Sequence, residues 1–98
     1  MLVLSYDGPN GPQKVQVDVE SICIGRHADN EVFLPDPRVA RRHCLIIRTE
    51  QGYTVLDNHS PGGIFVNGKR VNEHLLRAGD RISVGASVIV VEESDDEG

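Results

Sequence analysis

The sequence predicts an all-β fold, a small sandwich or barrel of short strands. Three observations carry this prediction. Apolar and polar residues alternate with a period of two, as in 15–19 and 81–84, whereas no helical period persists for ten residues. Residues that favour turns separate these segments at short spacing. Valine, isoleucine and leucine recur along the whole chain, which suits a β-rich core.

Ten strands are expected from this pattern. They cover residues 2–6, 14–19, 21–25, 31–34, 43–49, 52–57, 64–66, 69–71, 80–84 and 87–93. The gap at 7–12, Asp-Gly-Pro-Asn-Gly-Pro, is a turn by composition. Asn67 and Gly68 supply the two positive-φ positions of a type I′ turn, so the strands on either side of them are expected to form a hairpin.

At 98 residues the chain has room for one core, so a single domain over 1–91 is expected. Residues 92–98 are then an acidic tail or the start of a linker. No apolar run approaches the roughly 20 residues that span a bilayer, so a cytoplasmic protein without a membrane partner is expected. Cys23 and Cys44 could pair, but two reduced thiols that act as small apolar side chains are favoured.

Positive charge is concentrated in one part of the chain. The net charge is −5, but five acidic residues lie in 92–98, so the rest of the chain is neutral. Within it Arg38, Arg41, Arg42 and Arg48 lie close together, and Arg26 precedes them. This local charge suits a single anionic group. A nucleic-acid surface needs a broader basic face and usually aromatic residues, so no nucleic-acid partner is expected.

Four motifs then follow one another in a recognisable order. They are Ile24-Gly25-Arg26, Val39-Ala40-Arg41-Arg42-His43, the segment from Ser60 to Gly68, and the segment from Leu76 to Gly85. Their order and spacing resemble the forkhead-associated (FHA) family. The resemblance implies an eleven-stranded antiparallel β-sandwich whose loops at one end bind an extended phosphothreonine peptide. It implies neither catalysis nor a cofactor.

The resemblance assigns the phosphate to Arg26, supported by Gly25, which lets the backbone pass close to a neighbour. Ala40 stands where the family has a serine, so one hydroxyl is missing. A hydrogen bond to a charged group contributes about 1.5–3 kcal/mol, so its loss is expected to weaken binding by roughly ten- to a hundredfold. Arg41 matches a position where basic or polar residues assist the phosphate, and it is expected to compensate.

The third motif departs further from the family pattern Ser-x-Asn-Gly-Thr. It keeps Ser60, expected to add a hydrogen bond to the peptide, and Gly63. Gly62 replaces the asparagine that holds the peptide backbone, and Pro61 offers no N–H. The resemblance assigns a bracing role inside the loops to His43, and it places Gly63 and Asn67 with Gly25 among the structural residues.

Two functions remain open from the sequence. The first is recognition of a phosphothreonine-containing protein, such as a substrate of a Ser/Thr kinase or another part of its own chain, by a monomeric domain. The second is an eroded domain that docks on another protein, or on its own chain, without phosphate. Ser60 beside His59 invites a catalytic triad, but no nucleophile elbow or oxyanion donors accompany it, so no enzyme is expected.

Two histidines near the expected loops, His27 and His59, are interpreted as ordinary loop residues. The alternative is that either donates an N–H to an anion or makes binding depend on pH. With His43 near them a zinc site can be imagined, but the sequence has no Cys-x-x-Cys or His-x-x-x-His spacing, so no metal site is expected.

Overall fold

The computed structural model describes residues 1–94, which form eleven β-strands and no helix. The strands are β1 Leu2–Gly8, β2 Gly11–Val17, β3 Ser21–Gly25, β4 Val32–Phe33, β5 Cys44–Thr49, β6 Gly52–Asp57, β7 Ile64–Val66, β8 Lys69–Val71, β9 Glu73–Leu75, β10 Arg81–Val84 and β11 Ser87–Glu93. These residues therefore include no helix of the length and apolarity needed to cross a bilayer.

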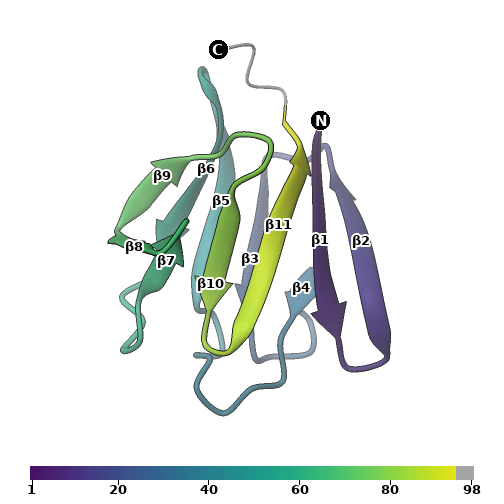
Figure 1. The fold of residues 1–98 in the computed structure, drawn as a ribbon, viewed down its shortest axis with the longest axis vertical. Coiled ribbons are helices and arrows are strands. Elements are labelled where there is room, and N and C mark those ends of the chain that lie inside the picture. The colour runs from purple at the N-terminus through teal and green to yellow at the C-terminus, as the bar shows by residue number, and fades with distance from the viewer. Residues whose placement is uncertain (95–98) are drawn as a thin grey trace.

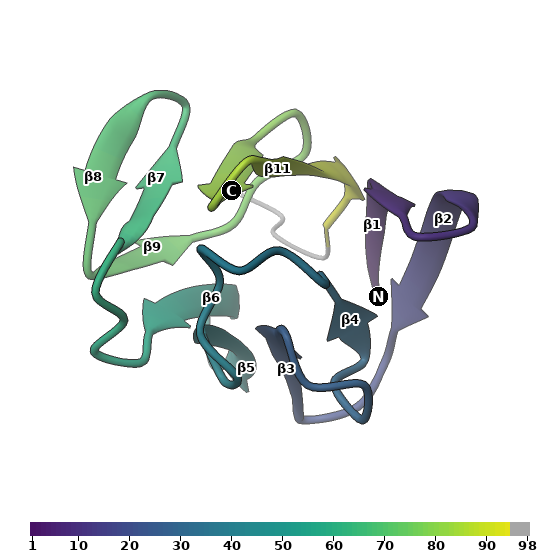
Figure 2. The ribbon, with the colours of Figure 1, turned by 90° about the horizontal axis from the view of Figure 1, so that it is seen from below.

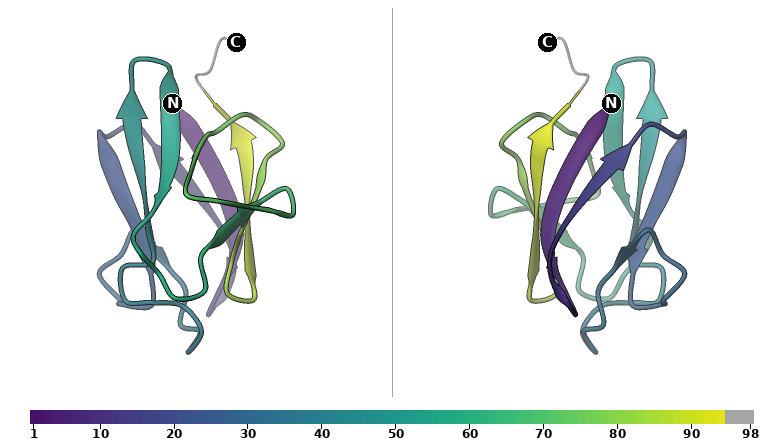
Figure 3. Two further views of the ribbon diagram at one scale, coloured as in Figure 1. Left: turned by 90° about the vertical axis from the view of Figure 1, so that its left-hand side faces the viewer. Right: turned by 90° about the vertical axis from the view of Figure 1, so that its right-hand side faces the viewer.

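The strands form two sheets packed face to face (Figures 1 and 3). One sheet has six strands in the order β2-β1-β11-β10-β7-β8, and the other has five in the order β4-β3-β5-β6-β9. Alternate side chains point between the sheets, so both contribute to one buried core. Its largest members are Tyr53, Leu2, Leu4, Ile24, Leu34 and Ile46. The Tyr53 hydroxyl donates to the carbonyl oxygens of Val17 and Val19, at 3.3 and 3.1 Å.

The predicted all-β sandwich is confirmed, with a few local differences. One pair of strands, β3 with β4, is parallel rather than antiparallel. The strand β9 was missed because its three residues follow β8 after a single residue and show no alternation of their own. The expected turn at 7–12 is shorter than predicted, since β2 already begins at Gly11. Pro12 fits there because β2 is an edge strand, where a missing N–H is tolerated.

The predicted Asn-Gly hairpin is confirmed. Asn67 and Gly68 have φ of 54° and 85°, and β7 pairs with β8 around them. The Asn67 side chain does more than turn the chain: its Nδ2 donates to Asp80 Oδ1 at 3.0 Å, and its Oδ1 accepts the N–H of Arg81 at 3.0 Å. It therefore fastens the hairpin to the start of β10.

The two cysteines lie on opposite faces of the five-stranded sheet. Cys44 faces the core opposite Ile24, whereas Cys23 lies beside Leu45 on the outer face. Both are free thiols. Burial raises the pKa of the Cys44 thiol far above its usual value, so this side chain stays protonated and packs as an apolar group.

Three long connections meet at one end of the sandwich, the lower end in Figure 1 and the end facing the viewer in Figure 2. They are the β3–β4 loop (26–31), the β4–β5 loop (34–43) and the β6–β7 loop (58–63). The N-terminus of the chain lies at the opposite end. Loops held by a rigid scaffold are common places for binding sites, so we expect the site at this end, called the loop end.

Candidate functional site

The end of β3 presses directly against the β4–β5 loop at Gly25. A Cβ atom at this position would lie 2.0 Å from the carbonyl oxygen of Arg41 and 2.9 Å from that of Ala40. No side chain fits such a gap, so glycine permits the contact. The approach allows the N–H of Arg26 to donate to Ala40 O at 2.9 Å, which fixes the two loops to each other.

The side chain of Arg26 is held at one nitrogen and open at the others. Its Nε donates to the carbonyl oxygen of Val39 at 2.9 Å. Its terminal nitrogens have no hydrogen-bond or ion-pair partner within residues 1–94, and the residue is exposed. Arg26 is therefore an oriented cation whose outer edge is available to a ligand.

Four consecutive carbonyl groups of the β4–β5 loop accept hydrogen bonds from neighbouring loops. The pairs are Val39 O with Arg26 Nε, Ala40 O with Arg26 N, Arg41 O with Asn30 Nδ2 (2.8 Å) and Arg42 O with Asn58 Nδ2 (3.0 Å). The loop is thus tied to both flanking loops, through Arg26 and Asn30 of one and Asn58 of the other.

The C=O and the following N–H of a trans peptide point in opposite directions, so the N–H of Arg41 points away from the partner of Ala40 O, and the N–H of Arg42 away from the partner of Arg41 O. The N–H groups of Arg41 and Arg42 have no acceptor within the described chain. Two neighbouring backbone donors of this loop are therefore free within residues 1–94, and each points away from the group that binds the carbonyl oxygen of its peptide. Successive free N–H groups of this kind form an anion-binding concavity.

His43 joins the β4–β5 loop to the β6–β7 loop from inside. The ring is fully buried, with Nδ1 accepting the N–H of Ala40 at 3.0 Å and Nε2 2.8 Å from Gly63 O. Because Nδ1 is an acceptor, the proton lies on Nε2 and is donated to Gly63. A neutral imidazole thus fixes the distance between the two loops.

In the β6–β7 loop, Ser60 is buried and its hydroxyl points toward Asp57. It is 7% exposed, and its hydroxyl donates to Asp57 Oδ1 at 2.5 Å. Pro61 and Gly62 form the exposed part of this loop, and a Cβ on Gly62 would meet nothing within 4 Å. The exposed surface of this loop therefore carries no polar side chain at Pro61 or Gly62, and the Ser60 side chain is buried.

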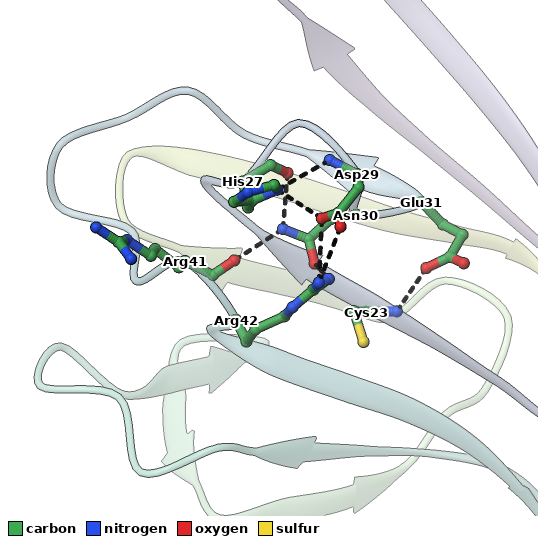
Figure 4. Close-up of polar contacts among 7 residues, drawn as sticks. All are labelled: Cys23, His27, Asp29, Asn30, Glu31, Arg41 and Arg42. Atoms are coloured by element: carbon green, nitrogen blue, oxygen red, sulfur yellow. Dashed lines mark hydrogen bonds and ion pairs between the residues drawn. The ribbon is translucent and has the colours of Figure 1, made fainter.

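A polar cluster supports the β3–β4 loop (Figure 4). Arg42 donates to Asn30 Oδ1 at 2.7 Å and pairs with Asp29 at 3.1 Å. Desolvation raises the pKa of Asp29, but the charges of Arg42 and His27 and their hydrogen bonds lower it by more, so the pKa lies below its usual value. In the same view the Arg41 side chain extends away from the cluster, without a partner among the described residues. Of the two adjacent arginines, Arg41 alone is thus available to a ligand.

Asp36 fastens the β4–β5 loop to the β10–β11 turn. Its Oδ1 accepts the N–H and the Nε of Arg38, at 2.9 and 3.1 Å, and its Oδ2 accepts the N–H of Ala86 at 3.0 Å. These hydrogen bonds, first from the two backbone groups and then from the guanidinium, lower the pKa of Asp36 to about 2.

The other candidates from the sequence lie at the loop end without forming a metal site. His27 Nδ1 is 2.6 Å from Asp29 Oδ1, and His59 is exposed with φ of 55°. Residues 1–94 contain no group of three or more His, Cys, Asp or Glu side chains that could hold a metal ion. Asn30 and Asn58, the two amides that tie the loops, were not predicted from the sequence, because no spacing pattern marks an asparagine whose partner is a distant carbonyl.

Comparison with known proteins identifies the family, because residues 22–85 match the FHA domain. The chain belongs to the FHA domain family. The resemblance inferred from the four motifs is thereby confirmed, together with the eleven strands that it implied.

Among curated proteins, this FHA domain is similar to the oxoglutarate dehydrogenase inhibitor of Corynebacterium jeikeium, with 38% identity over 84 residues. That match covers 86% of this chain but 58% of the relative, so the chain spans less than two thirds of that protein.

Two solved FHA structures are also similar. One, from a study of phosphothreonine-dependent FHA domain interactions, has 37% identity and a TM-score of 0.82 and covers 92% of this chain and 93% of its own. The other, the FhaA FHA domain complexed with the intracellular domain of Rv3910, has 36% identity and a TM-score of 0.83, with coverage of 93% and 99%.

Proposed function

We propose that this FHA domain recognises protein segments that carry phosphothreonine. The observation that carries the proposal is the Arg26 guanidinium, which Val39 O holds at Nε and which is open at its terminal nitrogens, beside a loop whose Arg41 and Arg42 N–H groups are also free within residues 1–94. A phosphate dianion accepts charge-assisted hydrogen bonds from guanidinium and backbone donors, which are about twice as strong as neutral ones. The relatives support this choice, since one similar FHA structure was studied for phosphothreonine-dependent interactions.

The free backbone donors also offset the absence of a serine hydroxyl at Ala40, where the family has a serine. One bond to a charged group contributes about 1.5–3 kcal/mol, so Ala40 removes a large but single contribution. Two N–H groups and the Arg26 side chain remain, and the unpaired Arg41 side chain adds positive charge among the described residues of the loop end. The proposed site therefore keeps most of its donors.

Phosphate-independent docking is the second candidate function. It is favoured by the β6–β7 loop, where the Ser60 hydroxyl is committed to Asp57 and where Pro61 and Gly62 present no polar side chain. In that case a partner protein, or another part of the same chain, contacts the sandwich without using Arg26.

The proposal describes a recognition module that acts without catalysis and without a cofactor. Its partners are proteins phosphorylated by Ser/Thr kinases, or a phosphorylated segment of its own chain, and it acts as a monomer. The cytoplasm is the proposed location, since kinases phosphorylate their substrates there and both thiols stay reduced.

A binding titration tests the proposal. A degenerate phosphothreonine peptide library is screened first, and the selected peptides are titrated against the wild type, Arg26→Ala and Arg38→Ala. Arg38 is the control because it lies in the neighbouring β4–β5 loop but is paired with Asp36. We expect Arg26→Ala to weaken binding at least tenfold, dephosphorylation to abolish it, and Arg38→Ala to change it less than twofold. Selected peptides that bind equally well after dephosphorylation and to Arg26→Ala would establish the phosphate-independent alternative instead.

A further inference from the structure

A second arginine lies at the edge of the loop end. Arg70 is the middle residue of β8, paired across the hairpin with Phe65 of β7. Its guanidinium lies on the backbone of Gly63, where a Cβ would be only 2.7 Å from Nε and 2.9 Å from Nη2. Glycine at position 63 therefore makes room for this guanidinium as well as supplying a φ of 70°. Figure 2 shows the β7–β8 hairpin next to the β6–β7 connection.

Arg70 is linked rigidly to the proposed phosphate donors. The carbonyl oxygen of Gly63, on which Arg70 lies, accepts a hydrogen bond from His43 Nε2, and Nδ1 of the same ring accepts the N–H of Ala40. A buried imidazole and two hydrogen bonds therefore fix the separation between Gly63 and the β4–β5 loop. Arg70 and the phosphate donors can therefore bind two anionic groups that lie at a fixed spacing on one ligand.

The charge of Arg70 is uncompensated. The residue is exposed, and no acidic side chain or acceptor pairs with it within residues 1–94. Other arginines of the loop end are neutralised, Arg42 by Asp29 and Arg38 by Asp36. Arg26, Arg41 and Arg70 remain, and together they give the loop end an unbalanced positive charge.

The surface next to Gly63 carries no long side chain. It is formed by Pro61 and Gly62, which are exposed, and a Cβ on Gly62 would meet open space. An extended peptide can lie across this stretch. Its side chains alternate in direction, so one of them can point at Arg70 while the phosphothreonine occupies the site near Arg26.

We propose that Arg70 determines sequence specificity by pairing with a carboxylate of the bound phosphopeptide, so that the domain selects phosphothreonine segments with an aspartate or glutamate near the phosphorylated residue. The inference rests on the proposed function. A guanidinium fits a carboxylate through two parallel hydrogen bonds, which lysine cannot reproduce.

Peptide selection tests this inference. The wild type, Arg70→Ala, Arg70→Lys and Arg70→Glu are screened with the same phosphothreonine library, with Arg81→Ala as the control. Arg81 is also exposed and has no side-chain partner among the described residues, but it lies on β10 rather than against Gly63. We expect the wild type and Arg81→Ala to select an acidic residue at one position. Arg70→Ala should lose that selection, Arg70→Lys should weaken it, and Arg70→Glu should select a basic residue there.

The affinities complete the test. Replacing the selected acidic residue by alanine should weaken wild-type binding about three- to tenfold and leave Arg70→Ala unchanged within twofold. The inference is overturned if the wild type selects no acidic residue, or if Arg70→Ala keeps the same selection. Both of those results leave the proposed function intact, because the peptides would still require phosphate and Arg26. A screen that yields no phosphate-dependent peptide overturns the proposed function and this inference together.

Discussion

Replacing Gly25 by alanine should destabilise the protein and displace the β4–β5 loop, because the new methyl group clashes with the backbone of that loop. The added methyl group would lie 2.0 Å from Arg41 O, whereas ordinary contact begins near 3.4 Å, so the β4–β5 loop has to retreat by more than an ångström. The hydrogen bonds from Arg26 N at 2.9 Å and His27 N at 3.4 Å then exceed bonding distance. Two lost bonds at about 1 kcal/mol each and about 1–3 kcal/mol of strain give a destabilisation of about 3–5 kcal/mol.

Urea unfolding followed by circular dichroism measures this loss. A denaturant slope of about 1–3 kcal/mol per molar places the midpoint at least about 1 M lower than in the wild type. Gly62→Ala is the matched control, because the same methyl group enters open space at a position without positive φ. We expect its stability to change by less than about 0.5 kcal/mol.

Phosphopeptide titration gives a second readout, since the retreat changes the position of the Arg41 and Arg42 N–H groups relative to Arg26. The reasoning is refuted if Gly25→Ala and Gly62→Ala have the same unfolding midpoint. It is also refuted if Gly25→Ala unfolds early yet binds phosphopeptide with wild-type affinity, because the backbone contact would then not position the donors.

Three further predictions concern single side chains. His43→Ala should destabilise the fold by about 2–5 kcal/mol, because two buried backbone groups lose their partner, and calorimetry showing a smaller loss than in Tyr53→Phe would contradict this. Tyr53→Phe removes a hydroxyl that donates to two carbonyls and should cost about 1 kcal/mol, measured by the same method. Ionised Asp36 favours the folded state, since its pKa falls from 3.8 to about 2 on folding. That contribution is complete above pH 4 and is lost as the pH falls toward 2, so acid titration should destabilise the wild type more steeply than Asp36→Asn.

The strands were largely predictable because each is governed by local alternation and turn chemistry. The Asn67-Gly68 hairpin is an example, since the required backbone angles belong to those two residues alone. The strand β9 was not predictable in this way. It exists because β6 offers a free edge to residues 73–75, which is a property of the assembled sheet.

The site was predictable in its motifs but not in its connections. Gly25, Arg26 and His43 could be named from the sequence, because each stands in a motif with a known order. The ties made by Asn30 and Asn58 depend on carbonyl groups brought near by folding. The direction of the Ser60 hydroxyl depends likewise on Asp57, three residues earlier and on the adjoining strand end.

The hydrogen-bonded carbonyl groups of residues 39–42 have a consequence for how FHA domains change in evolution. A motif compares side chains, but every residue except proline carries the same backbone N–H. As long as the carbonyls stay tied, substitution of a side chain in this loop leaves the two outward donors of Arg41 and Arg42 in place. Only a proline, or a change in the residues that hold the carbonyls, removes them. The absence of a familiar hydroxyl in a sequence is therefore weak grounds for concluding that an FHA domain has lost its ligand.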